Sequence, residues 1–76
     1  MPRPLPEIVR EIRADWKKIY FGAVPYLDAM ECINSVNDTY ICESGTTLVL
    51  YFLSNASTWR GEVAKRVKAE LKAMCK

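Results

Sequence analysis

The sequence predicts an all-α fold, a compact four-helix domain in which the third helix is apolar and buried. Apolar residues recur at three- and four-residue steps in the first and last thirds of the chain, which is the spacing of helices with one buried face. Half of the 76 residues are hydrophobic and 26% are charged, a composition typical of a folded domain. We therefore expect a single domain over residues 1–76, with residues 1–5 as a proline-stiffened, extended lead-in.

The first helix is predicted to begin near Pro6, because proline is tolerated at the first helical position. Lys17 and Lys18 suit the negative end of the helix, and Gly22 is suited to closing it. The apolar stripe of this helix consists of Leu5, Ile8, Ile12, Trp16 and Ile19.

A second helix is predicted to begin at Pro25 for the same reason, and Asn37-Asp38 provides turn-forming residues at its end. Leu27 lies off the apolar stripe of this helix, so we expect its side chain to be exposed. The stripe itself consists of Tyr26, Ala29, Met30, Ile33 and Val36.

The segment from Thr39 to Leu53 has two interpretations. With Ser44-Gly45 as a two-residue turn, its Thr, Val, Tyr and Phe residues form a β-hairpin at 39–52, which makes the fold α+β. Alternatively, Ser44 caps a helix from about Gly45 to Asn55 that is apolar on all sides and therefore central. We favour the helix, because a lone two-stranded ribbon is weak and the chain offers no third strand.

The fourth helix is predicted to carry Trp59 in its first turn, with Ser57 or Thr58 as its N-cap. Gly61, near this start, is expected to let a neighbouring backbone approach closely. The stripe of this helix consists of Trp59, Val63, Val67, Leu71 and Met74. Pairs of opposite charge four residues apart are Glu62 with Arg66 and Arg66 with Glu70.

Residue types that catalysis needs are scarce. The chain has no histidine, which is the commonest general base and metal ligand, and its serines have no partner base. Glu7, Glu11 and Asp15 step along one face of the first helix, but the interleaved basic residues indicate a solvated, self-pairing surface. We therefore predict no enzymatic activity and no cofactor.

Three cysteines, Cys32, Cys42 and Cys75, are widely spaced and include no C-x-x-C pair, so no metal site is expected. Because the N-terminus lacks an apolar leader, they indicate reduced thiols and a cytoplasmic location. The longest uninterrupted apolar run, residues 48–53, is far shorter than the roughly 20 residues that a membrane span needs.

Charge is distributed unevenly along the chain. Residues 19–59 contain four acidic residues and no lysine or arginine, whereas residues 60–76 carry a net charge of +4. Such a basic segment on one amphipathic helix suits phosphate contacts, so nucleic-acid binding is an alternative function. Lysine dominates this helix, however, and base-reading arginine and asparagine residues are few.

Two stretches contain features of binding surfaces. YFGAVPY (residues 20–26) places three aromatic residues around a Gly/Pro turn, where they either staple two helices together or form an exposed patch. YFLSNASTWRGE (residues 51–62) is a helix–corner–helix joint, in which polar residues end one helix and cap the next. Arg60 at this joint is either solvated or an anchor for a partner.

With YFGAVPYLDAM (Tyr20–Met30) and YFLSNASTWRGE (Tyr51–Glu62), the chain resembles a group of short proteins of unassigned activity from bacteriophages and conjugative elements. The resemblance covers residues 8–74, and neither stretch carries a known catalytic residue. It implies a compact protein made by a mobile element inside a bacterium. Proteins of that size and origin often bind and block a host or rival machine, as anti-CRISPR proteins do.

We therefore predict a non-enzymatic protein-binding module, an inhibitor of a bacterial defence or host complex. The residues predicted to contact this partner are Tyr20, Tyr26, Arg60 and Lys65. One alternative is a small DNA- or RNA-binding accessory protein that uses Arg60, Lys65, Arg66, Lys68 and Lys72. A second is a homodimeric scaffold, since self-association stabilises short chains.

Overall fold

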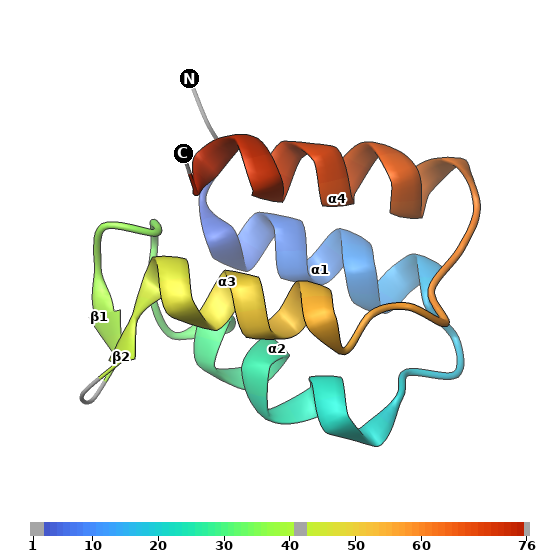
Figure 1. Ribbon diagram of the computed structural model, residues 1–76, viewed down its shortest axis with the longest axis horizontal. Coiled ribbons are helices and arrows are strands. Elements are labelled where there is room, and N and C mark those ends of the chain that lie inside the picture. Colours follow the sequence, from blue (N-terminus) through green and yellow to red (C-terminus); the bar gives the residue numbers. More distant parts are fainter. Residues whose placement is uncertain (1–2, 41–42, 76) are drawn as a thin grey trace.

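The computed structural model describes residues 3–40 and 43–75, which form a mainly helical chain (Figure 1). Its elements follow in the order α1 (Leu5–Asp15), the 3-10 helix η1 (Phe21–Ala23), α2 (Val24–Glu31), β1 (Thr39–Tyr40), β2 (Glu43–Ser44), α3 (Gly45–Ser54) and α4 (Glu62–Met74). The prediction of a mainly helical fold is confirmed, and a small two-stranded sheet is added to it.

The four α-helices alternate in direction, and each packs against its neighbours in the chain (Figure 1). α1 and α4 also pack on each other, so the helices form a closed ring around one core. In this ring α1 and α3 lie on opposite sides, as do α2 and α4. Each helix therefore has one side toward the core and one side toward solvent.

α1 is shorter than the sequence predicts. It ends at Asp15, and Trp16 adopts an extended backbone with ψ of 93°. This departure turns the Trp16 ring into the core, where it stacks on Trp59 with ring centroids 5.7 Å apart and meets the edge of Phe52 at 6.2 Å. The prediction of a helix through Ile19 is therefore wrong, because aromatic packing overrides the helical spacing.

α2 also ends early, at Glu31 rather than at Asn37-Asp38. The Asp38 carboxylate accepts hydrogen bonds from the backbone N–H groups of Asn34 and Ser35, at 3.0 and 3.2 Å, and so stabilises a turn where a helix was expected. Leu27 is fully buried, which contradicts the prediction of an exposed side chain. α2 is shorter than expected and follows a 3-10 turn, so the side of it that faces the core differs from the side predicted for the longer helix and includes Leu27.

The segment from Thr39 to Ser54 contains a short ladder followed by a helix. Thr39 pairs with Ser44 and Tyr40 with Glu43, and the ladder extends no further among the described residues. The hairpin at 39–52 is therefore wrong beyond its first residues, and Ser44-Gly45 is not its turn. Ser44 instead caps α3, accepting a hydrogen bond from the Thr47 N–H at 3.2 Å, as predicted.

Gly45 allows α3 to begin against the turn that follows α2. A Cβ at this position would lie 2.7 Å from Val36 Cα and 2.8 Å from the Ser35 carbonyl oxygen, both backbone atoms that cannot easily move. The Gly45 N–H donates to the Asp38 carbonyl at 2.8 Å, and the Thr46 N–H donates to the Val36 carbonyl at 3.2 Å. The close backbone approach predicted for Gly61 is thus found at Gly45.

α4 begins at Glu62, later than predicted, and Ser57 and Thr58 do not cap it. Its N-cap is Gly61, whose φ of 114° is strained for any other residue, and nothing lies within 4 Å of a Cβ built there. Trp59 precedes the helix and is 2% exposed, so its predicted return to the core is confirmed although its place in the helix is not.

α3 is not buried on all sides. Leu48, Val49 and Phe52 point into the core, whereas Leu50 and Tyr51 are 49% and 50% exposed. The expectation of a central, fully buried third helix is therefore wrong. α3 is one of four peripheral helices, and its apolar residues continue onto its outer side.

Candidate interaction surface

The outer side of α3 carries no charge. Thr47, Leu50, Tyr51 and Ser54 form this side at helical spacing, and the whole segment from Ser44 to Trp59 contains no charged residue. Exposed sides of helices in soluble proteins are ordinarily rich in charged residues, and depletion of charge is typical of the centre of a protein–protein interface.

Aromatic side chains extend this side of α3 toward α2. The rings of Tyr26 and Tyr51 lie 5.6 Å apart between their centroids, which joins the start of α2 to the second half of α3. The rings of Tyr20 and Phe21 lie 4.9 Å apart at the start of η1, and Phe21 is 80% exposed. Phe21 is the most exposed large hydrophobic residue in the described part of the chain.

Gly22 lies between the Tyr20 ring and the end of α3. A Cβ at position 22 would lie 2.6 Å from Tyr20 Cε2 and 3.0 Å from the side-chain oxygen of Asn55, so the Tyr20 ring and the end of α3 both meet at this glycine. The Asn55 amide donates in turn to the Tyr51 carbonyl at 2.8 Å. We use the name aromatic surface for the exposed and half-buried side chains of this region, which are Tyr20, Phe21, Tyr26, Leu50 and Tyr51.

Two cations of α4, Arg66 and Lys68, have partners within the chain. Arg66 turns toward α1 and pairs with Glu11, which removes it from the predicted nucleic-acid field. Lys68 is half-buried, and its Nζ donates to the Trp59 carbonyl at 2.7 Å and lies 5.9 Å from the centroid of the Trp59 ring. Burial, and then the nearby positive charges of Lys72 and Arg60, lower the pKa of Lys68.

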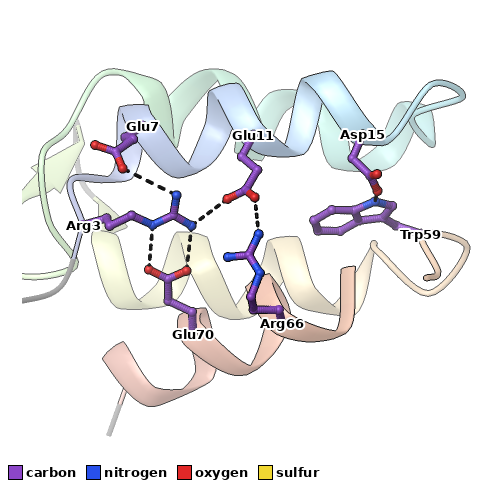
Figure 2. Close-up of polar contacts among 7 residues, drawn as sticks. All are labelled: Arg3, Glu7, Glu11, Asp15, Trp59, Arg66 and Glu70. Carbon is purple, nitrogen blue, oxygen red and sulfur yellow. Dashed lines mark hydrogen bonds and ion pairs between the residues drawn. The ribbon is translucent and has the colours of Figure 1, made fainter. Parts of the chain in front are cut away.

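α1 and α4 are joined by an ion-pair network centred on Arg3 (Figure 2). The Arg3 guanidinium donates to both carboxylate oxygens of Glu70, at 2.7 and 2.9 Å, and to Glu11 at 2.8 Å. The Arg3 hydrogen bonds are the largest cause of the lowered pKa of Glu70 and Glu11, and they raise the pKa of Arg3. The pairs of Arg66 with Glu62 and Glu70 predicted within α4 are not found: Arg66 pairs with Glu11 of α1, and Glu70 pairs with Arg3 of the lead-in.

The three carboxylates of α1 therefore have structural partners. Asp15 accepts a hydrogen bond from Trp59 Nε1 at 2.8 Å, Glu11 pairs with two arginines, and Glu7 lies 3.5 Å from Arg3 (Figure 2). Within residues 3–40 and 43–75, no Cys, Asp and Glu side chains group closely enough to hold a metal ion. This face fastens α4 and the lead-in to α1.

Two of the three cysteines lie among the described residues, and Cys42 lies outside them. Cys32 is exposed just after α2. Cys75 is half-buried at the end of α4, with its Sγ 4.0 Å from the Thr46 carbonyl, and burial raises the pKa of its thiol. The Cys75 contact identifies the edge of α4 that faces α3.

A shallow groove of about 680 Å³ opens where the lead-in meets the turn after α2 and the end of α4. It is lined by Arg3, Pro4, Asn34, Ser35, Val36, Asn37, Ala73 and Met74. Arg3 is the only ionisable residue among these, and its guanidinium already pairs with three carboxylates, those of Glu7, Glu11 and Glu70. The groove thus gathers no chemistry of its own.

The predicted contact residues are only partly brought together. Tyr20 and Tyr26 belong to the aromatic surface, whereas Arg60 and Lys65 are exposed on the corner and on α4 and share no ion pair or hydrogen bond with it among the described residues. Leu50 and Tyr51 were missed, because an apolar helix was interpreted as wholly buried. The uncharged segment from Ser44 to Trp59 is compatible with their exposure but does not distinguish an exposed helix from a buried one.

Comparison of the chain with family models, with curated proteins and with solved structures finds no match. The resemblance to proteins of bacteriophages and conjugative elements therefore stays a prediction. Every helix in residues 3–40 and 43–75 is too short or too polar to cross a lipid bilayer.

Proposed function

We propose that this protein is a non-enzymatic protein-binding module and that the aromatic surface is its contact face. The observation that carries the proposal is the outer side of α3, which is half exposed at Leu50 and Tyr51 and lacks charge along its whole length. Tyrosine and other aromatic residues are enriched at the centres of protein interfaces, where charged residues are depleted.

A bacterial defence or host complex is the proposed partner, and the activity is inhibition by binding. This part rests on the sequence resemblance to proteins of mobile elements. The small size of the chain suits it, because an inhibitor that acts by occlusion needs a contact surface and no reaction chemistry. Aromatic side chains of limited flexibility provide such a surface at low entropic cost.

Photo-crosslinking tests the proposal. Leu50 is replaced by a photoreactive phenylalanine analogue in bacterial cells, and a matched chain carries the analogue at Ala14, which is exposed on α1. We expect the Leu50 position alone to yield a discrete adduct, identified by mass spectrometry. Titration of the purified partner should then show that Leu50→Glu weakens binding at least tenfold, as expected for a central interface residue.

The outcomes separate the alternatives. Equal yields of adducts at positions 50 and 14 would remove the aromatic surface as a contact face. An adduct between two copies of the chain, with dimerisation in light scattering, would favour the homodimeric scaffold.

Nucleic-acid binding by the basic helix remains a second candidate, because Arg60, Lys65 and Lys72 are exposed and lie in no ion pair among the described residues. It predicts retardation of a labelled duplex that weakens steeply between low and moderate salt. Absence of retardation at low salt would exclude it.

A further inference from the structure

We infer that the partner segment that lies on α3 is an acidic amphipathic helix, bound between the outer side of α3 and a row of lysines on α4. This inference rests on the proposed function and adds the chemistry of the partner. It follows from three features: the orientation of α4, the lack of carboxylate partners for its lysines among the described residues, and the direction of α3 and α4.

The orientation of α4 follows from its contacts. One edge carries Arg66 and Glu70, which bond to α1 and to Arg3 of the lead-in. The other edge carries Cys75, whose Sγ approaches the Thr46 carbonyl at the start of α3. Lys68 lies seven residues before Cys75 and shares this edge, because residues separated by two turns occupy the same side of a helix.

Lys65 and Lys72 flank Lys68 at three- and four-residue steps, so the three lysines form a row on the α3-facing shoulder of α4. We call it the lysine row. Among the described residues, no carboxylate lies within ion-pair distance of any of its members. By contrast, Arg3, Arg13 and Arg66 all have carboxylate partners.

The spacing of Lys65, Lys68 and Lys72 brings three basic side chains to one side of α4. Lys68 is held in place by its hydrogen bond to the Trp59 carbonyl, and its pKa is lowered by burial and by its neighbours Lys72 and Arg60. A partner carboxylate placed there gains attraction from several cations without competing with an internal acid.

Direction decides the kind of partner. α3 and α4 pack against each other and run in opposite directions (Figure 1). Because their axes are aligned, the lysine row on α4 extends along the uncharged outer side of α3. A helix laid along α3 would place apolar residues over Leu50 and acidic residues over Lys65 and Lys72, which are separated by about 10 Å along α4. A helix with an acidic stripe next to an apolar stripe therefore complements the lysine row and the uncharged outer side of α3.

The test is an NMR titration of the labelled chain with a synthetic helical peptide of roughly 18 residues, with leucines on one stripe and glutamates about two turns apart beside it. Otherwise identical peptides carry glutamine or lysine in place of glutamate. We expect the glutamate peptide to shift the amide signals of Thr47, Leu50 and Ser54. The glutamine peptide should bind roughly three- to tenfold more weakly, because two exposed ion pairs are lost.

A matched pair of variants isolates the lysine row. The double variant K65Q/K72Q should bind the glutamate and glutamine peptides equally, whereas R10Q/K17Q, at exposed positions of α1 and of the segment after it, should discriminate between the peptides as the unchanged chain does. Equal affinity of the unchanged chain for the glutamate, glutamine and lysine peptides would overturn the acidic partner and leave the contact face standing.

Other outcomes are equally decisive. If photo-crosslinking at position 50 finds a partner but no peptide shifts α3, the acidic helix is wrong and the proposed function survives. If neither experiment gives a signal, both fall. If anionic phosphatidylserine vesicles or duplex DNA shift the lysine row at concentrations where the glutamate peptide does not, the row serves a membrane or a nucleic acid.

Discussion

The seam between α1 and α4 and the outer side of α3 use opposite chemistry. The seam is built from charged residues that satisfy one another, with Arg3 bound to Glu11 and Glu70. The outer side of α3 has no charge at all, and its Leu50 and Tyr51 are about half exposed to solvent, although one side of the Tyr51 ring contacts Tyr26 of α2. Both regions lie on the surface of the same chain. The charged groups of the seam have partners within the chain, whereas Leu50 and Tyr51 stay about half exposed.

This difference separates a surface that stabilises the fold from one that we propose as the contact face for a partner. Exposed ion pairs each contribute little, but a bidentate arginine shared by two helices fixes their relative position. An exposed aromatic and leucine surface contributes little to the folded state of the isolated chain and is costly to leave in water. Substitutions in the two regions should therefore affect different measurements.

The largest loss of stability is expected for a substitution on the inner side of α3, and a matched substitution on its outer side should cost much less. Phe52→Ala should lower the free energy of unfolding by about 3–5 kcal/mol, because Phe52 is fully buried and packs against Trp16. Tyr51→Ala, one residue earlier, should lower it by less than about 1 kcal/mol. Urea unfolding followed by tryptophan fluorescence measures both, and equal losses would show that α3 is buried on both sides.

The next effect concerns the start of α3. Gly45→Ala should destabilise the chain by about 1–3 kcal/mol, because the added Cβ meets the backbone of Ser35 and Val36. Gly22→Ala meets mainly the Tyr20 ring, which can rotate away, so its unfolding midpoint in urea should fall less. A larger loss for Gly22→Ala would reverse the assigned roles of the two glycines.

In the seam, Arg3→Gln should lower the free energy of unfolding by roughly 1 kcal/mol, since the network is partly exposed. The loss should shrink as salt is added, and a double-mutant cycle with Glu70→Gln should show coupling between the two positions. Thermal unfolding of the four chains at low and moderate salt gives this comparison, and purely additive losses would rule out the bond.

The same network predicts a pH dependence. Arg3 lowers the pKa of Glu11 and Glu70 in the folded chain, so these groups add stability at pH values above the ordinary carboxyl pKa of 4.5. That stability is lost as pH falls through the lowered values. Arg3→Gln should flatten the acid side of the curve of unfolding free energy against pH, and an unchanged slope would contradict the assignment.

The smallest effect on stability is expected at the proposed contact face. Leu50→Glu should change the free energy of unfolding by no more than about 0.5 kcal/mol, because Leu50 is 49% exposed. Circular dichroism during urea unfolding checks this value. A loss comparable with that of Phe52→Ala would mean that Leu50 serves the fold and is unsuitable as an interface variant.

Local signals in the sequence predicted the helical class, the Ser44 cap and the return of Trp59 to the core, because spacing and capping chemistry act over a few residues. They failed where distant contacts decide. Trp16 lies outside α1 and stacks on Trp59. The Asp38 side chain stabilises a turn in the region where a longer α2 was expected.

The candidate site was predictable only in part, for a related reason. Tyr20 and Tyr26 were identified from an aromatic turn, but Tyr51 joins them through a contact between α2 and α3 that no local pattern contains. Apolar composition alone does not distinguish a helix at the centre of a domain from one at its edge. The missing charge between Ser44 and Trp59 fits both, and only the packing of α3 decides.

The central claim is that the outer side of α3 is uncovered in the free chain while its inner side is core. Paramagnetic relaxation by a soluble nitroxide, measured by NMR on the dilute chain, tests it most directly. The account predicts strong relaxation of the side-chain signals of Phe21, Leu50 and Tyr51 and weak relaxation of those of Phe52 and Trp59. Protection of Leu50 and Tyr51 equal to that of Phe52 would contradict it.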